Sequence, residues 1–82
     1  MSKDQILSRV IGVLAQSFSL DRQKIQPTSH LFEELELDSI DAIDLMVGLE
    51  EETGIKLSEG ELHQIRRVQD VVDAIHRHME AA

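Results

Sequence analysis

The sequence predicts an all-α fold, a four-helix bundle with a long loop after the first helix and a short third helix. Apolar residues recur at helical intervals in separate segments, and no strand-like alternation is long enough to indicate a sheet. Because 41% of the 82 residues are hydrophobic and only two are aromatic, the core has to be built from Leu, Ile, Val and Met, which suits packed helices. We expect a single domain with a small core over residues 1–82.

The first helix is expected from about Lys3 to Ser17. The segment Ser2 to Gln5 has the spacing of a capping box, in which the serine and glutamine side chains satisfy backbone N–H groups at a helix start. Apolar residues then follow at helical intervals, namely Ile6, Val10, Val13, Leu14 and Phe18.

From Ser19 to Leu37 this periodicity disappears, and the only proline, Pro27, lies here. Connections of this length are uncommon in compact domains unless they are functional. We therefore expect scattered apolar residues to anchor the loop across the bundle, and a short helical turn near Leu31 to Leu35 to be capped by Ser29. The anchoring residues are Leu20, Ile25, Leu31, Leu35 and Leu37.

The second helix is expected from Ser39 to about Thr53, with Asp38 as its N-cap and Gly54 as its stop. Spacing at 100° per residue predicts two apolar faces. One face suits the core and holds Ala42, Leu45, Met46 and Leu49. The other holds Ile40, Ile43 and Val47, which either pack as simple core against the long loop or stay available to a ligand or partner.

The last two helices are expected from Ser58 to about Ile65 and from about Val68 to Met79. Ser58 and Glu61 form a second capping-box pattern, with Leu62 and Ile65 facing inward, but Gly60 weakens this short helix. In the final helix, Asp70 near the start and His76, Arg77 and His78 near the end complement the helix dipole.

Charge is concentrated in one segment of the chain. The net charge is −8, and the range 33–52 holds nine acidic residues and no Lys or Arg. Nucleic acid is therefore not expected as a partner, whereas proteins with basic surfaces are. No apolar run approaches the roughly 18 residues that span a bilayer, and we expect a cytoplasmic monomer.

Ser39 is the candidate for chemical modification, because a helix N-terminus favours an attached anion such as a phosphodiester. We expect no catalytic residue, since Ser39 lacks the G-x-S-x-G setting of a hydrolase and no histidine has a compelling spacing to it. We also expect no metal site, because Asp38, Asp41 and Asp44 lack the loop glycine and terminal glutamate of an EF-hand. With no cysteine, any thioester chemistry needs an imported thiol.

The segment Leu35 to Glu51 resembles the modification site of acyl carrier proteins, whose signature is Asp-Ser-Leu or a close variant at the start of an acidic helix. Here the signature reads Asp38-Ser39-Ile40. The similarity continues through Ile65 and the stretch Val68 to Ile75, and more loosely back to Ile6, so it covers nearly the whole chain.

This resemblance implies that phosphopantetheine is transferred from coenzyme A onto Ser39 by a phosphopantetheinyl transferase, which also reads Asp38. The cofactor then supplies the missing thiol. The second helix would be the recognition element for that transferase, for a ketosynthase and for other acyl-processing enzymes with basic docking patches. Its contact residues would be Ile40, Asp41, Ile43, Asp44, Val47, Glu50 and Glu51.

Three departures from the family pattern are apparent. Ile40 replaces the usual leucine, Arg66-Arg67 stand where threonines are common and predict a fraying start of the last helix, and Gly60 loosens the third helix. A specialised polyketide or aryl-polyene type of pathway is therefore as well supported as fatty-acid synthesis. Two alternatives stay open: an aminoacyl or peptidyl carrier, and a helical protein-binding adaptor in which Ser39 is unmodified or phosphorylated.

Overall fold

Four α-helices form at the segments that the sequence predicts. The computed structural model describes residues 2–81, and its elements are α1 (Lys3–Phe18), a 3₁₀ helix η1 (Arg22–Lys24), α2 (Ser39–Thr53), α3 (Glu59–Gln64) and α4 (Val68–Ala81). Within these residues there is no strand, only an isolated bridge between His30 and Arg67. The all-helical fold class is thereby confirmed, and α4 continues two residues beyond the predicted end at Met79. None of the helices in this range is long and apolar enough to cross a membrane.

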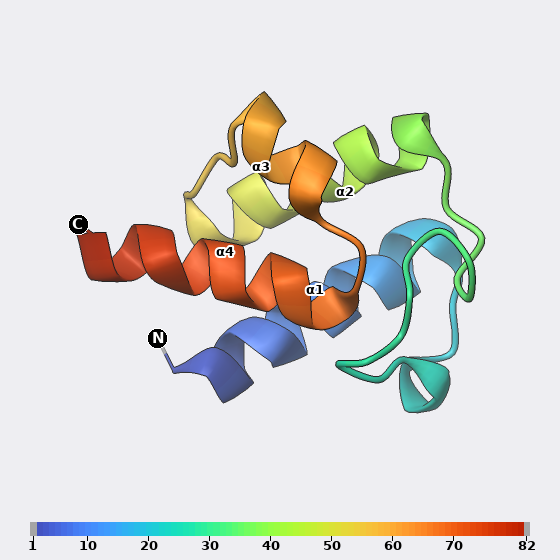
Figure 1. Ribbon diagram of the computed structural model, residues 1–82. Helices are drawn as coiled ribbons and strands as arrows, with labels where there is room; N and C mark the ends of the chain where they lie inside the picture. Colours follow the sequence, from blue (N-terminus) through green and yellow to red (C-terminus); the bar gives the residue numbers. More distant parts are fainter. Residues whose placement is uncertain (1, 82) are drawn as a thin grey trace.

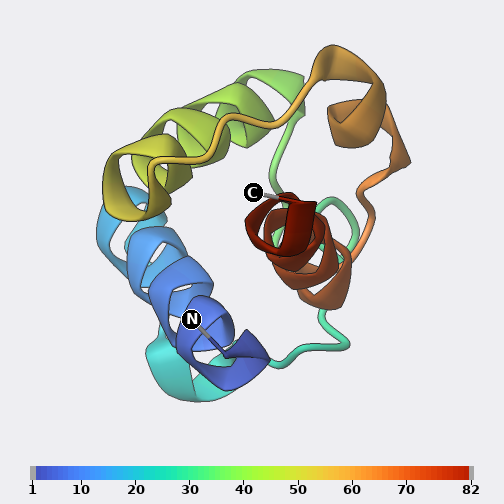
Figure 2. The ribbon, with the colours of Figure 1, turned by 90° about the vertical axis from the view of Figure 1, so that its left-hand side faces the viewer.

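Helix α1 is the centre of the packing, since it contacts both α4 and α2. Figure 1 shows α4 running alongside α1, with α2 and α3 above them, and Figure 2 shows α1, α2 and α3 arranged around α4. The predicted capping boxes of Ser2 and Ser58 are formed, and the predicted N-cap Asp38 forms one as well, so each of these helices begins where its cap places it. The largest of the fully buried side chains are Ile6, Val10, Leu14, Leu31, Leu45, Leu49, Val68, Val71, Val72 and Ile75.

The long loop from Ser19 to Asp38 is anchored by its apolar residues, as predicted. Ile25, Leu31 and Leu37 are buried, while Leu20 and Leu35 are half-buried against the core. The 3₁₀ helix η1 was not predicted; Asp21 caps it by accepting a hydrogen bond from the Gln23 N–H at 2.9 Å.

The predicted cap of the turn near Leu31 was wrong. Residues 31–34 form a hydrogen-bonded turn rather than a helix, and the Ser29 hydroxyl accepts instead from the Gln26 N–H at 2.9 Å. The residue that caps the turn is His30, whose Nδ1 accepts from the N–H groups of Phe32 and Glu33 at 3.2 and 3.1 Å. The turn therefore starts one residue later than the serine suggested.

The predicted fraying at Arg66-Arg67 was also wrong. The carboxylate of Asp70 accepts from both of these backbone N–H groups, at 3.1 and 3.0 Å, and so replaces the missing hydroxyl cap. The loop holds the same junction from its other side, because the carbonyl of Ser29 accepts from the Val68 N–H at 3.1 Å. The start of α4 is thus fixed to the segment that leads into α2.

Helix α3 is tied to α4 by a hydrogen bond between His78 and Glu61. His78 Nε2 lies 2.9 Å from both carboxylate oxygens of Glu61, so this histidine does more than complement the helix dipole. Hydrogen bonding from the Ser58 backbone N–H, and then from His78, lowers the pKa of Glu61 to about 2. One carboxylate therefore caps α3 and joins it to α4.

Candidate functional site

Ser39 is the first residue of α2, and its side chain is exposed. The preceding residue, Asp38, accepts a hydrogen bond from the Asp41 N–H at 2.9 Å, and Asp41 in turn accepts from the Asp38 N–H at 3.2 Å. Both carboxylates are therefore committed to fixing the helix start, and with it the direction in which Ser39 points. The cap was predictable from the sequence, whereas this reciprocal bond was not predicted.

The two backbone N–H groups between these caps are unused. No hydrogen bond within residues 2–81 involves the N–H of Ser39 or of Ile40. Orphan N–H groups and the positive end of the helix dipole together form the kind of site that binds phosphate groups. An anion attached to the Ser39 hydroxyl would meet both.

A hollow of about 320 Å³ opens beside Ser39, between α2, α3 and the loop. Its apolar wall comes from Phe32, Ala42, Ile43 and Leu62. Glu59, His63 and Arg66 complete the lining, and the Arg66 guanidinium is already bonded to the carbonyl oxygens of His63 and Ile65 at 2.6 and 2.9 Å. Leu62 and Ala42 were predicted to face the core, and Phe32 was not predicted to be a site residue, although it is one of only two aromatic residues.

The predicted second apolar face of α2 is open to solvent. The exposed fractions of Ile40, Ile43 and Val47 are 70%, 56% and 52%, so these residues are not core. At 100° per residue, they share an arc of about 120° with three acidic residues of the same helix. We call this surface the outer face of α2; it consists of Ile40, Ile43, Asp44, Val47, Glu50 and Glu51. Asp41 was predicted to belong with them but lies on the flank, where it serves the cap.

Cations from elsewhere in the chain reach only the margins of the acidic segment. Arg9 contacts Glu52 at 3.0 Å, and Arg67 lies 3.9 Å from Glu34. Among the described residues, the other seven carboxylates between Glu33 and Glu51 form no ion pair. The outer face of α2 therefore presents three unpaired acidic side chains around three exposed apolar ones.

Nothing in the described part of the chain activates Ser39 from within. No hydrogen bond there involves its hydroxyl, and no group of three or more His, Asp or Glu residues could hold a metal ion. The Ser39 side chain is accessible and no base among the described residues is hydrogen-bonded to it, which suits a residue that another protein modifies.

The backbone next to Ser39 is strained at one residue. Glu36 has φ = 60°, in the left-handed region, where a non-glycine residue costs roughly 1–2 kcal/mol. The one other non-glycine residue of positive φ in the range 2–81 is Ser19, with φ = 56°, at the end of α1.

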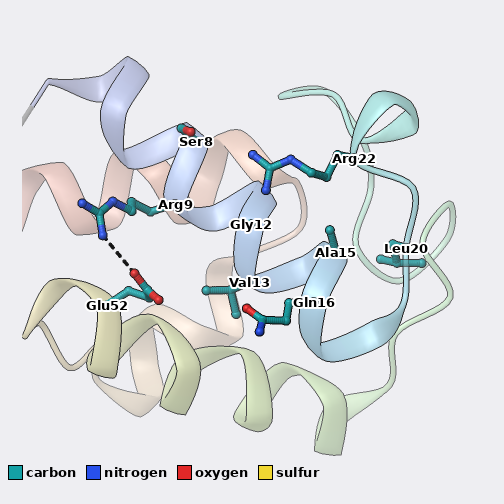
Figure 3. A pocket seen from close by; sticks show the side chains of 9 residues that line it. All are labelled: Ser8, Arg9, Gly12, Val13, Ala15, Gln16, Leu20, Arg22 and Glu52. Atoms are coloured by element: carbon teal, nitrogen blue, oxygen red, sulfur yellow. Dashed lines mark hydrogen bonds and ion pairs between the residues drawn. The ribbon is translucent and has the colours of Figure 1, made fainter.

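A second hollow lies away from Ser39. It measures about 590 Å³ and runs along α1 past Gly12, towards Glu52 at the far end of α2 (Figure 3). Ser39 and Glu52 are thirteen residues apart on one helix, which separates them by roughly 20 Å. This open groove is therefore no part of the surface around Ser39.

Comparisons with known proteins bear on this arrangement. Residues 5–75 match the family model described as phosphopantetheine attachment site. The chain is 41% identical to acyl carrier protein 2 of Ralstonia nicotianae over 75 residues, covering 92% of this chain and 93% of that protein. It is 35% identical to an acyl carrier protein of Thermosynechococcus vestitus and 30% identical to one of Rubrobacter xylanophilus. Each of these alignments covers 99% of this chain and 100% of the relative.

Proposed function

Since the chain belongs to the acyl carrier protein family, whose members bear phosphopantetheine covalently and are not enzymes, we propose that Ser39 is the attachment residue. The single observation that carries this assignment is the placement of Ser39. It is an exposed hydroxyl at the first position of α2, beside two backbone N–H groups that no described residue uses. Asp38 would be read together with it by the transferase.

The residues around Ser39 suit the group that the family carries. Its phosphodiester would lie near the N–H groups of Ser39 and Ile40, where the helix dipole favours negative charge. When bound, the arm supplies the thiol that this chain lacks, since the sequence contains no cysteine. The apolar part of the adjacent hollow suits an acyl chain more than a charged cargo, which favours an acyl over an aminoacyl carrier.

The outer face of α2 is the proposed docking surface for the enzymes that load and process the acyl group. Asp44, Glu50 and Glu51 would steer basic patches of a phosphopantetheinyl transferase or a ketosynthase towards Ser39. Ile40, Ile43 and Val47 would then be buried in the complex. On such a surface the charged residues set the association rate, and the apolar residues set the dissociation rate.

The acyl groups themselves are proposed to belong to fatty-acid synthesis or to a polyketide or related specialised lipid pathway. Support for fatty-acid synthesis comes from the acyl carrier protein names of the relatives. The native thioester, identified by mass spectrometry on protein from its source, distinguishes these pathways, and an amino acid on the thiol would instead support the aminoacyl alternative.

Incubation with coenzyme A, Mg²⁺ and a broad-specificity phosphopantetheinyl transferase tests the attachment residue. Intact mass should increase by one phosphopantetheine group in the wild type and not at all in Ser39→Ala. The circular dichroism spectrum of Ser39→Ala should remain helical, because this exposed side chain forms no hydrogen bond. Modification of Ser39→Ala, or none of the wild type with several transferases, would contradict the proposal.

A further inference from the structure

We propose that Glu36 is a further recognition residue, whose carboxylate contacts a Lys or Arg side chain of the phosphopantetheinyl transferase that acts on Ser39. This inference rests on the proposed function of Ser39. Glu36 lies three residues before Ser39, outside α2 and therefore outside the surface from which partner contacts were predicted.

The backbone of Glu36 is held in its strained conformation by both neighbours. Leu35 is half-buried and its N–H donates to the His30 carbonyl at 3.1 Å. Leu37 is buried and its N–H donates to the Leu31 carbonyl at 3.0 Å. The chain must turn between Leu35 and Leu37, and the left-handed backbone conformation of Glu36 makes that turn. Glycine commonly occupies such a position because it adopts positive φ without strain.

The structure shows no interaction by which the Glu36 side chain would stabilise the fold. Its side chain is exposed, and within residues 2–81 it forms no hydrogen bond and no ion pair. Glu36 lines a hollow of about 280 Å³ that Asp21, Lys24 and Glu34 also line. None of these three side chains forms an ion pair or a hydrogen bond with Glu36. Because Glu36 strains the backbone and its side chain has no partner within the described residues, we infer that its partner belongs to another protein.

The location of this carboxylate suits the approach of a basic enzyme. Glu36 lies three residues before Ser39 and the N-cap Asp38 one residue before it, and the Asp38 carboxylate is occupied by the Asp41 N–H. Glu36 therefore offers an unpaired negative charge in the loop that precedes Ser39, whereas the outer face of α2 follows Ser39 in the chain. A transferase that spans Ser39 would meet acidic side chains on both sides.

The test measures the rate of phosphopantetheine transfer at low and high salt for three variants of Glu36 and two control variants. Glu36→Gly and Glu36→Asn remove the charge and tolerate positive φ, whereas Glu36→Asp keeps the charge. Ser19→Gly is the matched control, since it relieves the same kind of backbone strain at the end of α1. Glu80→Gln controls for net charge, because it lies at the end of α4, far from the start of α2 (Figure 1).

For Glu36→Gly and Glu36→Asn we expect kcat/KM to fall about two- to fivefold at low salt, mainly through KM, and to approach the wild-type value at high salt. Their melting temperatures should be no lower than that of the wild type. Glu36→Asp and both controls should transfer at the wild-type rate.

Wild-type rates for Glu36→Gly and Glu36→Asn would overturn the inference while leaving the role of Ser39 intact. Rates for Glu36→Asp as low as those for Glu36→Asn would also overturn it, because the carboxylate would then not be recognised. Failure of the wild type to accept the group from any transferase would instead overturn the proposed function itself, and this inference with it.

Discussion

Gly48 of α2 lies close to Val13 of α1, and replacing it with alanine should destabilise the fold. A Cβ atom built on Gly48 would lie 2.8 Å from Cγ1 of Val13. Val13 is β-branched and only 7% exposed, and in Figure 3 it lies between α1 and α2, so it has little freedom to move away. In Gly48→Ala, either α1 and α2 must move apart or Val13 must adopt a different rotamer.

The expected size of this effect is the difference between two terms. Alanine is better than glycine in a helix interior by about 0.8–1 kcal/mol. Overpacking of a closed contact costs typically 1–3 kcal/mol. The net loss should be on the order of 1 kcal/mol, which lowers the melting temperature of a domain of this size by roughly 4–8 °C.

Gly60→Ala is the matched control, because the nearest atom to its added Cβ, the Ser58 Oγ, is 4.0 Å away. With the propensity gain and no clash, Gly60→Ala should stabilise the protein by about 0.5–1 kcal/mol. Thermal and urea unfolding followed by circular dichroism would measure both variants. In a double-mutant cycle, Val13→Ala should recover part of the loss caused by Gly48→Ala. If Gly48→Ala is as stable as Gly60→Ala, the two helices are not packed as closely as described.

Three further predictions concern docking, pH and salt. Asp44→Lys and Glu51→Lys should slow association with the transferase at low salt, and this effect should shrink as salt rises. Ile43→Ala or Val47→Ala should instead speed dissociation. Unchanged association and dissociation rates would show that the outer face of α2 is not the docking surface. The pKa of Glu61 is about 2 in the folded protein, below the ordinary value of 4.5. The stabilisation by this carboxylate is therefore complete above that ordinary value and is lost as the pH falls towards 2. The difference in free energy of unfolding between the wild type and Glu61→Gln should shrink between about pH 5 and pH 3, and a constant difference would refute this. Salt or millimolar Mg²⁺ should raise the melting temperature, because seven unpaired carboxylates repel one another in one segment; a melting temperature indifferent to both would mean that this repulsion is negligible.

The helices were predictable because their signals are local. Asp38, Gly54 and the periodic apolar residues between them mark both ends of α2, and the structure places its limits at the predicted residues. The 3₁₀ helix η1 was not predictable in this way, since three residues show no periodicity. The caps supplied by His30 and Asp70 were missed although both are local. Histidine is not among the usual N-cap residues, and Asp70 was assigned to the helix dipole alone.

The surroundings of Ser39 were predictable only in part. The helical spacing of Ile40, Ile43 and Val47 indicated a second apolar face, but whether the loop covers it depends on where Leu35 and Leu37 anchor. The hollow formed by Phe32, Leu62 and their neighbours arises from three separate segments, namely the loop, α2 and the region of α3. The positive φ of Glu36 has no sequence signal, because a glutamate there gives no indication of a left-handed turn.

The central claim is that Ser39 bears phosphopantetheine, and tandem mass spectrometry of protein purified from its source tests it most directly. The peptide that contains Asp38-Ser39-Ile40 should carry the phosphopantetheine group on Ser39, with part of the population bearing an acyl thioester on its thiol. An unmodified or simply phosphorylated Ser39, or the group on any other serine of the chain, would contradict the account.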